Sequence, residues 1–212
     1  MTPEFKQFIE NIAGEKAPGP STTFSVAHIF YALESVAEKP IGRNKLAEKL
    51  SIGDGAIRTI TNRLKDAGLI ATSKAGCTLT AKGLGVWKKF EEFFPKRVAI
   101  GKTELTTAEY NYAFLVKNSG HKVKSGIEQR DAAIVAGAKR AVVIVSKEGH
   151  LIIESVSDNI EKKFPKAASQ ILKVTQPEDN DVIIIAGADV PEKAKNAAFA
   201  ASWALLGGDK KK

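Results

Sequence analysis

The sequence has 212 residues, of which 43% are hydrophobic and 26% charged, and this composition is that of a globular protein with one large or two modest domains. No apolar run is long enough to cross a bilayer, and residues 1–15 lack the pattern of a secretory signal. The single cysteine, Cys77, excludes an internal disulfide. We therefore expect a cytoplasmic protein without a membrane partner.

The positive charge is concentrated in one stretch of the chain. The formal net charge is +8, and residues 39–90 contain 11 basic and three acidic residues, which accounts for the whole excess. A local basic field on an otherwise balanced protein favours a polyanionic partner, such as a nucleic acid. The alternative is a surface whose charges only keep the protein in solution.

The first 95 residues are predicted to be mostly helical, because apolar residues recur at helical spacing and turn residues separate the repeats. Gly53 is expected to permit a sharp turn, and Asp54 to cap the helix that follows it. Ala75-Gly76 marks the tip of a short hairpin. The expected elements are helices over 3–12, 25–38, 43–50, 54–67 and 84–94, a hairpin over 69–80, a stiff loop over 17–22 and a tight turn over 51–53.

This order of elements predicts a winged helix-turn-helix. Leu46, Ala47 and Leu50 are placed to pack against Ile57, Ile60 and Leu64, which leaves the outer face of the second helix free to enter a DNA groove. Arginine and asparagine can read guanine and adenine edges, and threonine can contact a thymine methyl. Lysines on the wing suit backbone phosphates. The candidate DNA-binding residues are Arg43, Lys45, Gly55, Arg58, Thr59, Asn62, Arg63, Lys74 and Lys82.

Four runs carry a resemblance to a known family. They are GRNKLAEKL (42–50), IGDGAIR (52–58), LKDAGLI (64–70) and LTAKG (79–83). Over about 55 residues they resemble the winged-helix transcription regulators of bacteria and archaea. The resemblance implies sequence-specific binding of double-stranded DNA, usually as a homodimer, with base and phosphate contacts from Arg58, Thr59, Asn62 and Arg63. Protein or RNA binding stays open as an alternative use of such a domain, and Arg63 can instead form a surface ion pair.

The helix over 84–94 is unusually aromatic. Trp87, Phe90, Phe93 and Phe94 need cover, either from the core or from a second copy of the chain.

Beyond a junction at residues 95–97, segments alternate between strand and helix patterns. The expected order is strand, strand, helix, strand, strand, helix, strand, helix, which predicts a single sheet with packed helices. The fold class is thus α/β with two domains: a winged helix over 1–95 and a ligand-sensing or dimerisation domain over 97–206. A disordered tail is expected over 207–212. The strands are expected over 97–106, 109–117, 141–146, 151–156 and 181–186, and the helices over 126–136, 165–172 and 191–206.

Two places in this second domain are candidates for ligand binding. Asp131 falls on an apolar helical stripe with Ile127 and Ile134, beside Gln129 and Arg130, and a buried carboxylate needs a partner. A structural ion pair explains the same pattern. Gly187-Ala188-Asp189 is predicted to be a turn between a strand and a helix, where backbone N–H groups can bind an anion. The candidate ligand-binding residues are Gln129, Arg130, Asp131, Gly187 and Asp189.

No catalytic motif is evident, and the three histidines have no partner at metal-ligand spacing, so no cofactor or metal is expected. The winged helix together with the segment at 126–139, which begins GIEQRDAA and ends AGAK, also resembles an uncharacterised group of archaeal proteins. The sequence therefore predicts a transcription regulator, not an enzyme, with double-stranded DNA as its partner and a small-molecule effector as a candidate second partner. The alternative hypothesis is an enzyme acting on a small anionic metabolite, with a fused winged helix.

Overall fold

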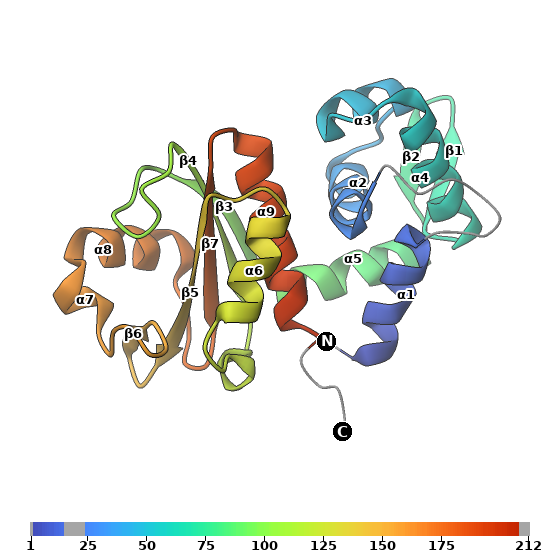
Figure 1. Cartoon of the computed structure of the whole chain (residues 1–212). Helices are drawn as coiled ribbons and strands as arrows, with labels where there is room; N and C mark the ends of the chain where they lie inside the picture. The colour runs from blue at the N-terminus through green and yellow to red at the C-terminus, as the bar shows by residue number, and fades with distance from the viewer. Residues whose placement is uncertain (1, 15–23, 208–212) are drawn as a thin grey trace. The chain divides into compact units, whose positions relative to one another are not determined.

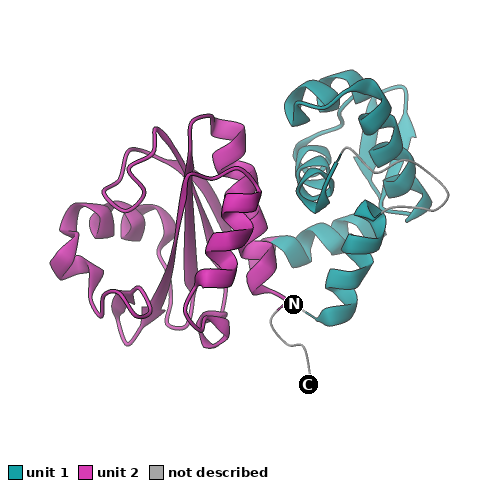
Figure 2. Cartoon of the chain, viewed as in Figure 1, with its two compact units in different colours: residues 1–90 teal, residues 91–212 magenta. Residues whose placement is uncertain are grey.

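The computed structural model describes residues 2–14 and 24–207. The predicted loop over 17–22 and all but the first residue of the predicted tail lie outside these ranges. The chain divides into two compact units, residues 1–90 and 91–212 (Figure 2).

Unit 1 contains a helix-turn-helix followed by a two-stranded hairpin and a helix (Figure 1). This confirms the predicted winged helix. The last helix begins three residues earlier than expected, and its final three residues belong to unit 2. The elements are α1 (Pro3–Ala13), α2 (Val26–Glu38), α3 (Arg43–Leu50), α4 (Asp54–Asp66), β1 (Ile70–Ser73), β2 (Gly76–Leu79) and α5 (Ala81–Phe93).

The turn between α3 and α4 uses a different residue from the one predicted. Gly53 has φ −72° and ψ 162°, an ordinary extended conformation, whereas Ser51 takes the left-handed conformation with φ 54°. Gly53 occupies the N-cap position, and Asp54 is the first helical residue. The reversal of the chain thus depends on Ser51, where a non-glycine residue carries some backbone strain.

Trp87 and Phe90 of α5, and Phe94 directly after this helix, pack against other aromatic rings of their own units. Phe90 packs edge-on against Phe5 and Phe30, with ring centroids 5.3 and 5.0 Å apart, and Trp87 lies 5.6 Å from Phe30. Within unit 2, Phe94 packs edge-on against Phe114. Of the two covers left open by the sequence, the core is the one observed for these rings.

Unit 2 is built on one antiparallel sheet of five strands, in the order β3-β4-β7-β5-β6. The prediction of one sheet with packed helices is confirmed. The first strand ends at Ile100 instead of residue 106, the fourth ends at Ile152, and a short helix, α7, was not predicted. The elements are β3 (Lys96–Ile100), β4 (Tyr110–Val116), the 3-10 turn η1 (Gly120–Lys122), α6 (Ile127–Val135), β5 (Arg140–Lys147), β6 (His150–Ile152), α7 (Ile160–Lys163), α8 (Pro165–Thr175), β7 (Val182–Ala188) and α9 (Pro191–Leu205).

Helices cover both faces of this sheet, with α6 and α9 on one side and α7 and α8 on the other (Figure 1). The central strand β7 is buried along its whole length. Ile183 and Ile185 belong to the core that contains Ile171 of α8, and the alternation of a strand turns Ile184 to the opposite face. Burial on both faces explains why β7 reads as an unbroken apolar run.

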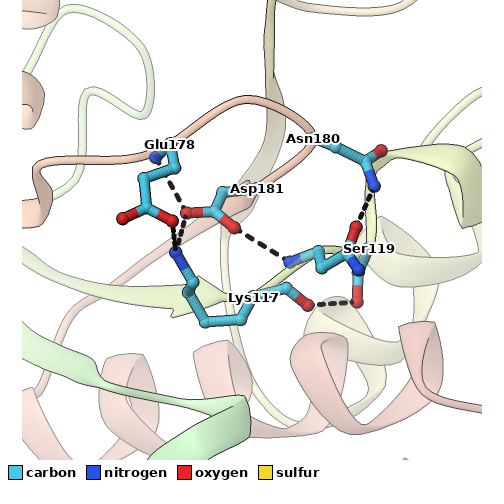
Figure 3. A network of polar contacts seen from close by, with 6 residues as sticks. Lys117, Ser119, Glu178, Asn180 and Asp181 are labelled. Carbon is cyan, nitrogen blue, oxygen red and sulfur yellow. Dashed lines mark hydrogen bonds and ion pairs between the residues drawn. The ribbon is translucent and has the colours of Figure 1, made fainter.

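A polar network joins the end of β4 to the start of β7 (Figure 3). The buried carboxylate of Asp181 accepts hydrogen bonds from the backbone N–H groups of Asn118 and Glu178, and from the Lys117 ammonium at 2.9 Å. Lys117 also pairs with Glu178 at 2.6 Å, and these contacts raise the pKa of Lys117. The Asn180 backbone carbonyl accepts from Ser119 N–H. Because Asp181 is fully satisfied, the network is a structural clasp that the sequence did not reveal.

Candidate nucleic-acid interface

The helix-turn-helix is held by the predicted apolar contacts. Leu46 and Ala47 of α3 are buried, as are Ile57, Ile60 and Leu64 of α4, and the two helices pack on each other. Arg58, Asn62 and Lys65 are exposed and stand at positions i, i+4 and i+7 of α4. Helical geometry places these three side chains on one outer face.

The wing is anchored to the rest of unit 1 at Gly76. Cys77 pairs with Ile41 as an isolated antiparallel bridge, so this single residue adds to the hairpin along the outer edge of β2. Gly76 has φ 114°, and a Cβ there would lie 2.6 Å from the Ile41 carbonyl carbon. Only glycine fits this approach. The hairpin is therefore fixed in place, with Lys74 and Ala75 exposed at its tip.

A polar cleft of about 450 Å³ lies between α4, the wing and the start of α3. Its lining includes three cationic side chains and the Asn62 amide but no carboxylate, and none of the three cations pairs with a carboxylate in the described part of the chain. Such a cleft suits a polyanion. It is lined by Gly42, Arg43, Thr61, Asn62, Lys65, Thr72, Ser73, Lys74, Ala75, Gly76 and Cys77.

The cleft brings together only some of the predicted DNA-binding residues. Arg43, Asn62 and Lys74 line it, while Arg58, Gly55 and Lys45 are exposed outside it. Sequence reasoning missed Lys65, although its spacing of three residues from Asn62 was a readable signal. The Thr59 hydroxyl donates to the Gly55 carbonyl at 3.0 Å, so its methyl group is the part left for a partner.

Arg63 has a structural role. Its guanidinium donates to the backbone carbonyls of Ile12, at 2.9 Å, and Gly14, and lies 5.1 Å from the Phe24 ring centroid. Arg63 therefore ties α4 to the end of α1. This differs from both roles weighed from the sequence, a DNA contact and a surface ion pair.

Lys82 is also engaged. Its ammonium donates to the Ala67 carbonyl at 2.8 Å, which satisfies a free carbonyl at the C-terminal end of α4. The same ammonium lies 5.2 Å from the Phe8 ring centroid. A lysine at the base of the wing was predicted to meet phosphate, but here it caps the helix that faces the cleft.

Cys77 is buried in unit 1, and His28 caps a helix of the same unit. Burial raises the pKa of the Cys77 thiol, while the nearby Arg43 charge acts in the opposite direction. The Nδ1 atom of His28 accepts a hydrogen bond from Ser25 N–H at 3.1 Å, as the third residue of a capping box at the start of α2, and burial lowers the pKa of His28. Among the described residues, no group of three or more His, Cys, Asp or Glu side chains is placed to hold a metal.

The stripe predicted to be buried on α6 faces outward. Asp131 is 64% exposed and lies 3.8 Å from Arg130, while Ile127 and Ile134 are also exposed. The buried residues of α6 are Gln129 and Ala133. The prediction that the carboxylate of Asp131 is buried is therefore wrong, because the apolar stripe lies on the solvent side of this helix.

The predicted anion-binding turn at 187–189 is also corrected. Gly187 lies inside β7, paired with Asn111 and Arg140, and a Cβ there would approach Ala108 to 2.6 Å. The glycine serves close packing against β4 and the loop before it. Asp189 forms an exposed ion pair with Lys139 at 2.6 Å. Of the five candidate ligand residues, Arg130 lines a cavity in unit 2.

Two family models match the chain. Residues 29–94 match the CggR N-terminal DNA binding domain, and residues 107–205 match a domain of unknown function, DUF4443. Comparison with curated proteins gives no match. No described helix is long and apolar enough to cross a membrane.

The chain is also similar to solved structures, over most or part of its length. Hypothetical protein PH0730 from Pyrococcus horikoshii OT3 is 26% identical, with a TM-score of 0.70, over 89% of this chain and 96% of that one. A MarR family protein, Rv2887 of Mycobacterium tuberculosis, solved in complex with DNA, is 22% identical, with a TM-score of 0.29, over 42% of this chain and 65% of its own. The part of the chain with the winged-helix order of elements is thus similar to a DNA-binding domain, and the C-terminal part matches a domain family of unknown function.

Proposed function

We propose that the protein is a transcription regulator that binds a specific double-stranded DNA sequence as a homodimer, and that unit 2 responds to a small ligand. The observation that carries the proposal is the cleft between α4 and the wing, which contains Arg43, Lys65 and Lys74 without a carboxylate. The match of residues 29–94 to a DNA-binding domain supports the same function.

The roles of the side chains follow from their positions. Arg58 and Asn62 stand on the outer face of α4, where a recognition helix meets base edges, and we assign them to base reading. Nothing lies within 4 Å of a Cβ built at Gly55, so the first turn of α4 leaves room for close approach to a groove. Arg43, Lys45, Lys65 and Lys74 are assigned to phosphates, which fix the register of the protein on the duplex.

The dimer follows from the geometry of DNA. One winged helix reads a few base pairs, so a specific site is normally read by two copies on an inverted repeat. Light scattering on the full chain, free and bound to the selected duplex, measures the stoichiometry. Two chains per duplex support this part of the proposal, and one chain per duplex contradicts it without affecting DNA binding itself.

The experiment for the whole proposal starts from selection of duplexes out of a randomised pool. Fluorescence anisotropy then compares the recovered duplex with a scrambled duplex and with an RNA of the same sequence, over a salt series. We expect the recovered duplex to bind about a thousandfold more tightly than the scrambled one, with affinity falling steeply as salt rises. Equal binding of all three contradicts sequence-specific recognition, and preference for the RNA assigns the winged helix to a different partner.

A further inference from the structure

Unit 2 contains a cavity of about 270 Å³ that the DNA-binding function does not use. It lies beside β5. On the outer side of this strand, β6 pairs only with residues 145–147, and within the described chain no strand pairs with the outer edge of residues 141–143. Backbone N–H and C=O groups along this edge have no strand partner on that side. The cavity is therefore bounded by a sheet edge as well as by side chains.

Most of the lining is apolar. Val142 and Val143 of β5, Leu105 and Phe164 form part of the wall. Two further apolar side chains in the lining stay in contact with water, since Ile127 is 50% exposed and Val156 is 62% exposed. An apolar ligand group that covers them gains free energy from this burial.

The lining also contains three charged side chains. Arg130 is 57% exposed, and its recorded partner is Asp131 at the long distance of 3.8 Å. Glu104 and Glu154 form no ion pair within the described ranges. One guanidinium and two carboxylates thus surround an apolar space, each able to take a ligand of opposite charge.

This charge pattern selects the ligand. A phosphate would meet two carboxylates with only one cation to offset them, and a plain carboxylic acid would leave both glutamates unsatisfied. An amine alone would leave the guanidinium unsatisfied. The volume lies just below the usual range for small-molecule sites, which favours a small ligand over a dinucleotide or a long lipid.

We propose that this cavity binds an apolar α-amino acid, whose carboxylate pairs with Arg130, whose ammonium group pairs with Glu104 or Glu154, and whose side chain covers Val143, Ile127 and Val156. The inference gives a chemical class to the ligand-sensing role proposed above, but the binding itself is independent of DNA recognition. The amino acid can also bond to the free edge of β5 through its polar groups, as an added strand residue would.

The test uses three matched probes on the full chain by titration calorimetry. These are L-leucine, isocaproate, which lacks the amine, and isoamylamine, which lacks the carboxylate, with L-phenylalanine as a larger amino acid. We expect one of the two amino acids to bind at least about tenfold more tightly than either analogue, because each analogue loses a charge-assisted contact. Absence of amino-acid binding at millimolar concentration, or equal binding of leucine and both analogues, overturns the proposal.

Variants assign the contacts. Arg130→Gln is expected to weaken the binding of leucine about tenfold and to leave the affinity for isoamylamine unchanged. The double variant Glu104→Gln with Glu154→Gln is expected to weaken the binding of leucine and to leave the affinity for isocaproate unchanged. Glu128→Gln is the matched control, because Glu128 is exposed on α6 but does not line the cavity. If the melting temperatures of the variants without ligand equal that of the unchanged protein, misfolding is excluded. If Glu128→Gln weakens leucine binding as much as the other variants do, the assignment is contradicted. Ligand binding that leaves DNA affinity unaltered retains this inference and removes the sensing role.

Discussion

The cavities of the two units have opposite chemical character. The two units also differ in how well the sequence predicted the buried face of the helix beside each cavity. In unit 1, the cleft beside α4 is polar and cationic, and apolar spacing correctly identified the buried face of that helix. In unit 2, the cavity beside β5 is mostly apolar, and the same spacing rule placed the wrong face of α6 inward. Apolar spacing alone thus identified the buried side of α4 but not that of α6, where Ile127 and Ile134 are exposed.

The largest stability effect is expected in unit 2. Asp181→Ala removes the 1% exposed carboxylate at the centre of the clasp and leaves two backbone N–H groups and Lys117 without it. We expect the free energy of unfolding of unit 2 to fall by about 3 kcal/mol. Denaturation followed by Trp203 fluorescence in a Trp87→Phe background measures this, because the two tryptophans of the sequence fall in different units.

Glu178→Ala is the matched control for the clasp. It removes the other carboxylate that meets Lys117, but this one is 79% exposed, so the expected loss is below about 1 kcal/mol. Similar losses for the two variants contradict a network centred on Asp181.

Arg63 separates fold from DNA contact within α4. We expect Arg63→Ala to lower the stability of unit 1 by about 1–3 kcal/mol, because a charged donor to the Ile12 and Gly14 carbonyls is lost. Trp87 fluorescence in a Trp203→Phe background follows this unit. At a temperature where the variant is folded, its preference for the recovered duplex over the scrambled one stays unchanged. Normal stability with lost preference reverses the assignment and makes Arg63 a DNA contact.

A smaller effect is expected from pH. Nδ1 of His28 accepts from Ser25 N–H only while it is unprotonated, and burial lowers the pKa of His28 below its ordinary value. The capping contribution is therefore fully present above the ordinary histidine pKa, near 6.5, and is lost as pH falls through the lowered value in the folded state. We expect a loss of about 1 kcal/mol in unit 1.

His28→Gln tests the cap. Glutamine can occupy the same capping-box position without titrating, so the variant should keep the stability of unit 1 and lose this part of its pH dependence. An unchanged pH profile in the glutamine variant assigns the dependence to other groups.

The smallest effect is expected at the tip of the wing. Lys74→Ala should lower the affinity for the recovered duplex and for the scrambled duplex by the same factor. It should also reduce the slope of log affinity against log salt by about 1. Lys88→Ala, an exposed lysine of α5 outside the cleft, is the matched control. Loss of specificity in the Lys74 variant contradicts a pure phosphate contact.

The sequence predicted what depends on local pattern. The winged-helix order, the buried contacts between α3 and α4 and the single sheet follow from periodicity and turn residues. Partners that are distant in sequence were not predictable: Arg63 meets the end of α1, Lys82 caps α4, and Asp181 meets Lys117. Gly187 was misread because a glycine needed for close packing inside a strand gives the same signal as a turn.

The central claim is that the outer face of α4 reads DNA sequence, and the double variant Arg58→Ala with Asn62→Ala tests it most directly. Both side chains are exposed, so the fold should be retained, as checked by circular dichroism and by Trp87 fluorescence. Anisotropy against the recovered and scrambled duplexes then measures specificity. We predict that the preference falls at least about a hundredfold, with weak salt-dependent binding retained through the phosphate contacts. An unchanged preference for the recovered duplex in the folded double variant would contradict the account.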